Sequence, residues 1–343
     1  DREVLLYTLE NSRGMQLKIS DYGGIITHWT VPDRNGEGRD IVLGFDRLEE
    51  YLAGHPFLGC IVGRFANRID KGRFTLEGQE YELAAQANGN HLHGGRRGFD
   101  KYIWDSRAER KSASSSLILG LYSPDGDEGY PGALDVEVRY TLFEDKRFRI
   151  DYKARLPVGG SQATIVNLSN HSYFNLNGNP ERGIENHNIQ IHADRYVEVD
   201  PRQIPTGNLP ALAGNSLDCR SMRYMGEIFA AVPDAVVDHC YVLTDSLADS
   251  MGAFKEVSIV EAPESGIRMR LLTDNVGVQF YNGNKLGNTN QVGKQGLRYV
   301  RFAGFCLETQ CFPDTPNHAH FPSCILQPGE IYTHSAEFHF ENF

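Results

Sequence analysis

The fold is decided by residues 134–154, which read LDVEVRYTLFEDKRFRIDYKA. Apolar side chains occupy every second position before residue 144 and again after residue 146, and charged residues separate the two runs. Because successive side chains of a strand point to opposite faces, each run predicts a strand with one apolar face. We therefore expect an antiparallel hairpin with its turn at residues 144–146.

The same alternation recurs along the chain. It is found at Leu17 and Ile19, from Phe74 to Leu83 around Glu77-Gly78, at Ile189 and Ile191, from Val257 to Leu271 and from Tyr332 to Phe340. Helical patterns are few, with short candidates at residues 46–51 and 222–231. The pattern favours an all-β fold, a large antiparallel β-sandwich with a few short helices. No linker or repeat divides the sequence, so we expect a single domain over residues 1–343.

Composition restricts the classes of partner. The formal net charge of −11 argues against nucleic acid, because phosphate backbones are bound by clustered Lys and Arg. The longest apolar runs are strand-sized, as at residues 116–121, so we expect a soluble protein without a membrane partner. Six scattered cysteines without a CxxC pair favour a reducing compartment and a cytoplasmic location. A leader cleaved before Asp1 is the alternative.

Five short segments carry more polar and ionisable side chains than turns need. They supply carboxylates, imidazoles, amides and arginines, which bond the hydroxyls of a sugar, and aromatic rings, which cover its apolar face. The segments are residues 63–69 (GRFANRI), 88–95 (NGNHLHGG), 167–176 (NLSNHSYFNL), 237–241 (VDHCY) and 307–310 (LETQ).

Two histidines in these segments are candidate acids or bases. His93 precedes Gly94-Gly95, a pair that lets the backbone turn sharply and bring the imidazole close to a ligand. His171 lies in a run of amide and aromatic side chains where a plain core strand would carry Val or Ile. The alternatives are a hydrogen-bonded loop histidine at position 93 and a buried structural histidine at position 171.

Glu308 and Asp238 each follow an apolar run, so we expect them in largely buried strands. A buried carboxylate must be partnered, or its pKa rises toward neutrality, and either outcome suits a general base. A buried ion pair is the alternative for Glu308, and a cap or turn with His239 is the alternative for Asp238. Arg68 is a candidate binding residue, and the alternative is an exposed arginine that pairs with Asp70 or with a glutamate.

Metal and nucleotide sites are not expected. His91 and His93 share one face of a strand-like pattern, and His318 and His320 repeat the spacing, but no third ligand falls at a diagnostic spacing. The glycine-rich phosphate loops and the serine-hydrolase elbow are missing from the sequence. Acid and base chemistry remains, and we expect neither a metal nor a cofactor.

Taken in order, these segments resemble the aldose 1-epimerase, or galactose mutarotase, family. The resemblance runs from Tyr22-Gly23-Gly24 to Leu326-Gln327-Pro328-Gly329 and covers nearly the whole chain. Each motif alone is weak, whereas the ordered combination is highly specific. The motifs between these ends are GRFANRI at 63–69, LHGG at 92–95, GFDK at 98–101 with Trp104, SPDGDEGYPG at 123–132, NHSYFNL at 170–176, Asp238-His239, VQFY at 278–281 and ETQ at 308–310.

The resemblance implies a β-sandwich with its site in a cleft on one sheet, and an enzyme that interconverts the α and β anomers of free aldohexoses such as galactose and glucose. It implies that Glu308 is the base that takes the proton of the C1 hydroxyl, and that His171 is the acid that protonates the ring oxygen. His93 is then the second histidine of the site. The implied substrate-binding residues are Asn67, Arg68, Tyr173, Asp238 and Gln279.

The expected partner is a small-molecule monosaccharide, and the chain is expected as a monomer or homodimer. One departure from the family pattern is Asn282-Gly283-Asn284, where Thr or Ser with a small residue is commoner. This departure bears on which sugar is preferred.

Three other functions compete with the epimerase. A hexose-6-phosphate mutarotase needs extra cationic groups, a carbohydrate-binding module needs no acid and base pair, and a glycoside hydrolase or lyase needs two facing carboxylates, such as Asp238 and Glu308.

Overall fold

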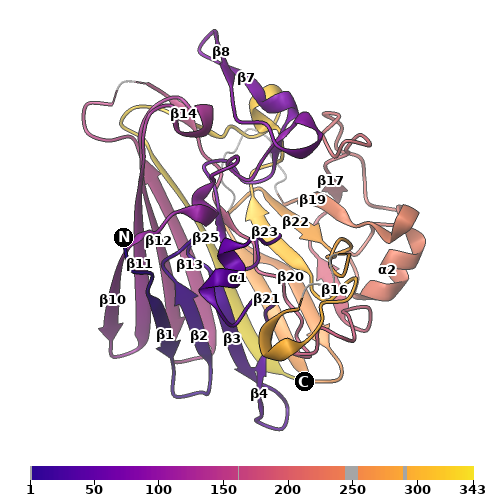
Figure 1. Cartoon of the computed structure of the whole chain (residues 1–343). Coiled ribbons are helices and arrows are strands. Elements are labelled where there is room, and N and C mark those ends of the chain that lie inside the picture. Colours follow the sequence, from indigo (N-terminus) through magenta and orange to yellow (C-terminus); the bar gives the residue numbers. More distant parts are fainter. Residues whose placement is uncertain (1, 161, 244–253, 289–291) are drawn as a thin grey trace.

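The computed structural model describes residues 2–160, 162–243, 254–288 and 292–343, and strands dominate it (Figure 1). One large antiparallel sheet has nine strands in the order β10-β11-β12-β13-β25-β21-β20-β16-β18. These strands are β10 (Asp105–Lys111), β11 (Ser114–Ser123), β12 (Leu134–Phe143), β13 (Arg147–Arg155), β25 (Ile331–Asn342), β21 (Ile267–Thr273), β20 (Lys255–Ala262), β16 (Asn188–Ile191) and β18 (Arg223–Tyr224). The predicted all-β antiparallel fold is confirmed.

A second layer packs on one face of this sheet and contains two four-stranded sheets. The first consists of β1 (Leu6–Glu10), β2 (Gln16–Ser20), β3 (Ile26–Pro32) and β4 (Gly38–Asp40). The second consists of β17 (Arg195–Tyr196), β19 (Asp238–Val242), β22 (Gly277–Tyr281) and β23 (Cys306–Gln310). Two-stranded ladders are β5 (Ile61–Val62) with β15 (Ser169–Asn170), β6 (Arg68–Ile69) with β9 (His91–Leu92), β7 (Arg73–Leu76) with β8 (Gln79–Glu82), and β14 (Thr164–Ile165) with β24 (Ile325–Leu326).

The helices are short. The α-helices are α1 (Leu48–Leu52) and α2 (Met225–Ala231), and the 3-10 turns are η1 (Asp70–Gly72), η2 (Ala87–Gly89), η3 (Phe99–Lys101), η4 (Asp127–Gly129), η5 (Pro233–Ala235), η6 (Lys294–Gly296) and η7 (Thr315–Asn317). The helix expected at residues 222–231 begins at Met225, because Arg223 and Tyr224 pair with β16 instead. No helix in the described ranges has the length and apolar character needed to span a membrane.

The hairpin at residues 134–154 is confirmed. Strands β12 and β13 pair with Leu142 opposite Phe148, and their alternate apolar side chains are buried. The predicted hairpin around Glu77-Gly78 is also confirmed, as β7 and β8. In both hairpins the period-2 pattern identified the strands and the polar break identified the turn.

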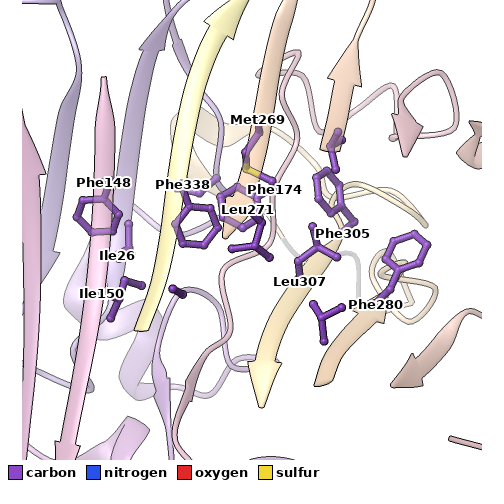
Figure 2. Close-up of a cluster of buried hydrophobic side chains, with 14 of the residues drawn as sticks. Ile26, Phe148, Ile150, Phe174, Met269, Leu271, Phe280, Phe305, Leu307 and Phe338 are labelled. Carbon is purple, nitrogen blue, oxygen red and sulfur yellow. The ribbon is translucent and has the colours of Figure 1, made fainter. Parts of the chain in front are cut away.

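The core lies between the two layers (Figure 2). Trp29 of β3 makes edge contacts with Phe148 of β13 and Phe338 of β25, at centroid distances of 4.6 and 5.3 Å. The same cluster continues through Phe280 and Leu307, which lie on β22 and β23. Truncating a buried aromatic residue of this kind costs about 3–5 kcal/mol of folding free energy. The core therefore holds β22 and β23 firmly against the large sheet.

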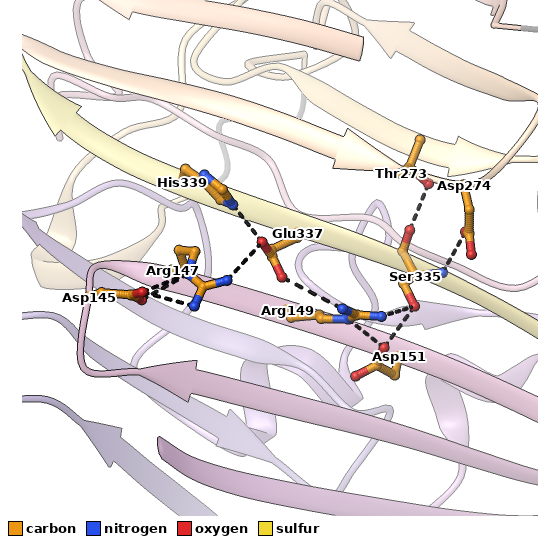
Figure 3. A network of polar contacts seen from close by, with 9 residues as sticks. All are labelled: Asp145, Arg147, Arg149, Asp151, Thr273, Asp274, Ser335, Glu337 and His339. Atoms are coloured by element: carbon orange, nitrogen blue, oxygen red, sulfur yellow. Dashed lines mark hydrogen bonds and ion pairs between the residues drawn. The ribbon is translucent and has the colours of Figure 1, made fainter. Parts of the chain in front are cut away.

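The other face of the nine-stranded sheet carries a network of ion pairs (Figure 3). Its centre is Glu337 of β25, which is 4% exposed. The Glu337 carboxylate lies 3.5 Å from Arg147, 3.8 Å from Arg149 and 2.5 Å from His339 Nε2. Each arginine also contacts an aspartate two residues away in the sequence. The buried charge of Glu337 is thus fully paired.

Strands β22 and β23 are buried on both faces, with every residue of the two strands covered. Leu307 and Thr309 point into the core, where Thr309 Oγ1 lies 3.2 Å from His334 Nε2 of β25. Because side chains alternate, Cys306 and Glu308 point to the opposite face. That face is the floor of the candidate site.

Candidate active site

The site floor is formed by neighbouring positions on three strands. Register places Cys240 of β19, Gln279 of β22 and Glu308 of β23 side by side. The next row on the same face consists of Asp238, Tyr281 and Cys306. The floor therefore combines two carboxylates with an amide, and all the predicted residues on these strands meet there.

His171 reaches the floor from the end of β15. Its backbone N–H donates to the carbonyl of Cys60 at 2.9 Å, which fixes the chain at this point. Its Nε2 lies 3.6 Å from Glu308 Oε1. The residues are 5% and 2% exposed, respectively. The two groups expected to act as acid and base are therefore in direct contact and shielded from solvent.

His93 packs edge-on against His171, with ring centroids 5.1 Å apart and an interplanar angle of 82°. Its backbone φ is +48°, and Gly94 and Gly95 follow with φ of +91° and +105°. A side chain does not fit at Gly94, because its Cβ would lie 1.7 Å from the Gly63 carbonyl oxygen. The sharp turn predicted after His93 is confirmed, and it aims the imidazole at the floor.

A single hydrogen bond fixes the tautomer of His93. The backbone N–H of Asn67 donates to His93 Nδ1 at 3.1 Å, so Nδ1 carries a lone pair and Nε2 carries the proton of the neutral ring. Burial, together with His171 and Arg68 nearby, keeps the pKa of His93 well below its usual value of 6.5. His93 therefore offers the site a neutral N–H donor.

Asp238 is held by two partners on the floor. Gln279 Nε2 donates to Asp238 Oδ1 at 2.6 Å, and an Arg68 guanidinium nitrogen lies 3.5 Å from Asp238 Oδ2. Arg68 also donates to the Asn67 side-chain oxygen at 3.4 Å. The alternative pairing of Arg68 with Asp70 is not formed, since Asp70 contacts Arg202 at 3.0 Å. Four of the five predicted binding residues, Asn67, Arg68, Asp238 and Gln279, thus form one connected group.

The environment moves the pKa values of Glu308 and His171 in opposite directions. Burial, followed by the charge of Asp238, raises the pKa of Glu308 well above 4.5, against a lowering by Arg68. Burial lowers the pKa of His171 from 6.5 to about 4. Both shifts favour a neutral imidazole beside a protonated carboxyl. This neutral pair and the corresponding ion pair differ only in the position of one proton.

Several buried polar atoms of the floor have no hydrogen-bond partner within the described part of the chain. They are Glu308 Oε2, Gln279 Oε1 and both side-chain polar atoms of Gln310. Unpaired buried polar groups are costly, and native proteins usually satisfy them. A ligand rich in hydroxyl groups would supply the missing partners.

Sequence reasoning missed Phe57 and Cys306. The Phe57 ring lies 4.7 Å from the ring of His93 and 5.8 Å from that of His171, and its backbone φ is +60°, which is strained for a bulky residue. Cys306 Sγ lies 3.5 Å from His171 Nδ1. A signal for Cys306 existed, because it precedes Glu308 by two positions on the same strand. No sequence signal pointed to Phe57, because its position in the site depends on the path of a loop.

Tyr173 contacts the acid through its ring rather than through its hydroxyl group. Its ring centroid lies 5.0 Å from that of His171, whereas its hydroxyl donates to the Pro56 carbonyl at 2.9 Å. Beyond Tyr173 lies a cavity of about 510 Å³, also lined by Tyr281 and Lys285. Tyr173 therefore joins the imidazole to the loop that carries Phe57.

A metal ion would find a poor donor set here. Ligand atoms of His93, His171 and Glu308 lie within 4.8 Å of one another. However, His93 Nδ1 already accepts the Asn67 N–H and Nε2 carries a proton, so the neutral ring has no lone pair to offer a metal. His91, the other member of the HxH pair, bonds the Ala84 carbonyl and the Tyr130 hydroxyl instead.

The departure at Asn282-Gly283-Asn284 is a packed turn. Asn282 is fully buried, and its side-chain amide donates to the Ala235 carbonyl at 2.9 Å. Gly283 has φ of +66°, and a Cβ there would lie 2.2 Å from the Gly304 carbonyl oxygen. The buried amide of Asn282 therefore binds its own backbone framework rather than extending the site floor.

The family model for aldose 1-epimerase matches residues 5–339. Galactose mutarotase from Homo sapiens is 42% identical over 326 residues, which cover 95% of this chain and 91% of the relative. Galactose mutarotase from Bos taurus is also 42% identical, with the same coverage. Aldose 1-epimerase from Escherichia coli is 35% identical over 342 residues, covering 98% of this chain and 94% of the relative.

Solved structures give the same result. A GalM/aldose epimerase homologue from C. elegans superimposes with a TM-score of 0.89 at 26% identity, with 99% of each chain covered. A galactose 1-epimerase from Lactobacillus acidophilus superimposes with a TM-score of 0.83 at 26% identity, covering 99% of this chain and 98% of the other. The fold is therefore shared over nearly the whole length of each chain.

Proposed function

The chain belongs to the aldose 1-epimerase family, and on that premise we propose that His93, His171 and Glu308 are the residues that carry out its reaction. The protein is an isomerase that interconverts the α and β anomers of free aldoses such as galactose and glucose. The residue assignment rests above all on the 3.6 Å contact between His171 Nε2 and Glu308 Oε1.

The proton balance of the reaction matches this pair. The sugar binds with its C1 hydroxyl at Glu308 and its ring oxygen at His171. The Glu308 carboxylate takes the hydroxyl proton, the His171 imidazolium gives its Nε2 proton to the ring oxygen, and the bond between C1 and the ring oxygen breaks to leave an aldehyde. The enzyme then holds neutral His171 and protonated Glu308, the state that burial favours.

Reclosure uses the same two groups in reverse. Rotation about C1–C2 presents the other face of the aldehyde to the C5 hydroxyl. His171 takes the proton of that hydroxyl while Glu308 returns a proton to the carbonyl oxygen, which gives the opposite anomer. One proton leaves the sugar and one returns in each half of the reaction, so neither an oxidant nor a net proton from solvent is required.

The remaining residues bind and orient the sugar. His93 donates its Nε2 proton to an oxygen at the anomeric end, since its tautomer is fixed by Asn67. Asp238 and Gln279 accept and donate hydrogen bonds to ring hydroxyls, and Arg68 holds Asp238 in place. The contacts made by the Asp238 carboxylate are charge-assisted, and each contributes about 1.5–3 kcal/mol to binding.

Aromatic rings complete the pocket. Tyr173 positions the His171 ring, and Phe57 covers both imidazoles from the loop above them. An apolar cover over the acid and base strengthens their electrostatic interactions with the sugar. The strained φ of +60° at Phe57 supports a functional role for this ring.

Domain organisation, oligomeric state and cellular location are proposed as the sequence predicts them. We propose one aldose 1-epimerase domain over residues 1–343, a monomeric or homodimeric state, and a cytoplasmic location. Burial of all six cysteines as free thiols supports a reducing compartment.

Polarimetry tests the function directly. The optical rotation of freshly dissolved α-galactose and α-glucose should reach its equilibrium value faster with the protein than without it. The His171→Gln variant should lower the catalysed rate by about 10²–10⁴-fold. Sugar binding without acceleration would favour a carbohydrate-binding module. New reducing ends released from a disaccharide would favour a hydrolase.

A further inference from the structure

A second cavity of about 390 Å³ lies on the outer face of β2, β3 and β4. It contains none of the residues assigned to the epimerase reaction. The three strands form its floor, and the segments 175–180 and 294–299 form its walls. Because these walls cover an otherwise solvent-facing sheet surface, the polar floor side chains are half-buried.

Register arranges the floor side chains in a grid. Gln16 of β2 lies opposite Thr30 of β3, and Lys18 lies opposite His28. Asp40 of β4 lies opposite Thr30 on its other side. The intervening residues of β2 and β3 face the core, so Gln16, Lys18, His28 and Thr30 present their side chains to the cavity.

The inner end of the cavity contains a buried lysine. Lys294 is 6% exposed, and its Nζ donates to Asp40 Oδ2 at 2.6 Å and to the Thr27 carbonyl at 2.9 Å. Asp40 Oδ1 accepts the Trp29 backbone N–H at 3.0 Å. Both carboxylate oxygens of Asp40 are therefore engaged, whereas one of the three N–H groups of Lys294 has no partner among the described residues.

Among the charged side chains that line the cavity, three are cationic (Lys18, Arg39 and Lys294) and one, Asp40, is anionic. Arg39 at its edge is balanced by Asp33 and Glu37, but Lys18 pairs with no carboxylate within the described ranges. Burial, then the positive charges of Lys294 and Lys18, lowers the pKa of His28 to about 4, against the opposing effect of Asp40. The like charges of Lys18 and Lys294 both disfavour a proton on His28, and a bound anion would offset the repulsion between them.

We propose that this cavity binds a small phosphate-type oxyanion, held by Lys18 and Lys294, with Gln16 and Thr30 as further donors. Lysine ammonium groups are common phosphate ligands, and several convergent donors match the acceptor oxygens of phosphate. The site is notable in a chain with a formal net charge of −11, whose average surface repels anions. Free phosphate and the phosphate of a sugar monoester share this chemistry.

Thermal unfolding in inorganic phosphate tests the proposal. A ligand that binds only the folded state raises the melting temperature with the logarithm of its concentration. Sodium phosphate should therefore stabilise the full chain more than sodium chloride at equal ionic strength. Lys18→Gln should bind phosphate about 10-fold more weakly, as expected for the loss of one charge-assisted contact, and should keep normal mutarotation. Equal stabilisation by chloride, or an unchanged phosphate response in Lys18→Gln, would overturn the site.

Two controls locate the effect. Lys153→Gln removes the same charge from the exposed part of β13 and should leave the phosphate response unchanged. Saturating galactose should not displace phosphate, and displacement would place the anion in the epimerase site and overturn the proposal. Tighter binding of glucose 6-phosphate than of inorganic phosphate would assign the cavity to a sugar monoester, and the reverse order would assign it to free phosphate.

Discussion

Glu308 and Glu337 are both buried glutamates on strands of the same sandwich, yet their surroundings are opposite. Glu337 is 4% exposed and is surrounded by Arg147, Arg149 and His339 (Figure 3). Glu308 is 2% exposed, its Oε1 faces a single histidine at 3.6 Å, and its Oε2 has no partner in the described structure.

The difference separates a structural carboxylate from a reactive one. Glu337 uses its charge to hold neighbouring strands together, so little of that charge is left for another partner. Glu308 is kept in a poorly solvated place without full compensation, which raises its pKa and leaves it ready to exchange a proton. Proteins accept such unsatisfied groups mainly where function requires them.

The strongest test compares Glu308→Gln with Glu337→Gln. The first should lower the rate of mutarotation by about 10²–10⁴-fold, because the amide cannot take the C1 hydroxyl proton. The second should leave the rate unchanged, because Glu337 lies on the outer sheet face. Polarimetry of both variants measures the contrast, and equal losses would show that the two carboxylates do not differ in role.

The next test concerns sugar affinity. Asp238→Asn should raise KM for galactose by about 10-fold or more, because a charge-assisted hydrogen bond to the sugar is weakened. Asp151→Asn is the matched change in the ion-pair network, where Asp151 contacts Arg149 at 2.6 Å, and it should leave KM unchanged. An unchanged KM for Asp238→Asn would remove Asp238 from the binding group.

The free energy of unfolding should respond in the opposite way to the rate, with a loss for Glu337→Gln and none for Glu308→Gln. Glu337→Gln should cost about 1–2 kcal/mol of unfolding free energy, a modest loss because its arginine partners are partly exposed to solvent. Glu308→Gln should be as stable as the wild type near pH 4.5 and more stable at higher pH. The reason is that a raised pKa in the folded state gives stability below the unfolded pKa, and this stability is lost as pH rises toward the folded pKa.

Denaturant unfolding between pH 4 and pH 8 measures this prediction. The advantage of Glu308→Gln over the wild type should grow as pH rises above 4.5 and should level off above the pKa of Glu308 in the folded state. A variant that is less stable than the wild type at pH 8 would show that the Glu308 charge is well compensated, and the contrast with Glu337 would disappear.

The smallest expected effect comes from Cys306. Its sulfur is a weak acceptor for His171 Nδ1, and the oxygen of Cys306→Ser is a stronger one, so the pKa of His171 should rise. The acid limb of the pH–rate profile should then move to higher pH, while the maximal rate changes by only about 3-fold. Cys219→Ser, in the core away from the site floor, is the control. A profile identical to the wild type would show that the thiol does not tune the acid.

Much of the fold could be predicted from the sequence because its strands bury one face. The alternation in residues 134–154 identified β12 and β13, together with the face that packs on Trp29. Residues 222–224 could not be placed this way. They continue a helical pattern, but Arg223 and Tyr224 pair with β16, and that partner lies far away in the sequence.

The candidate site was predictable in its residues but not in its geometry. Glycines after His93 and the polar run around His171 indicated chemistry, and the structure brings both histidines to the face of Glu308. The tautomer of His93 depends on the backbone N–H of Asn67, a contact that no residue pattern encodes. The unpaired state of Glu308 Oε2 likewise depends on the arrangement of all its neighbours.

The double burial of β22 and β23 has a consequence for motion. Backbone amides of a strand covered on both faces exchange with deuterium mainly through large-scale unfolding, whereas loop amides exchange through local opening. We therefore expect the segment that carries Glu308 to be among the slowest-exchanging of the described residues. The loop that carries Phe57 should exchange much faster, which would make the cover of the pocket the part that opens to admit and release each sugar.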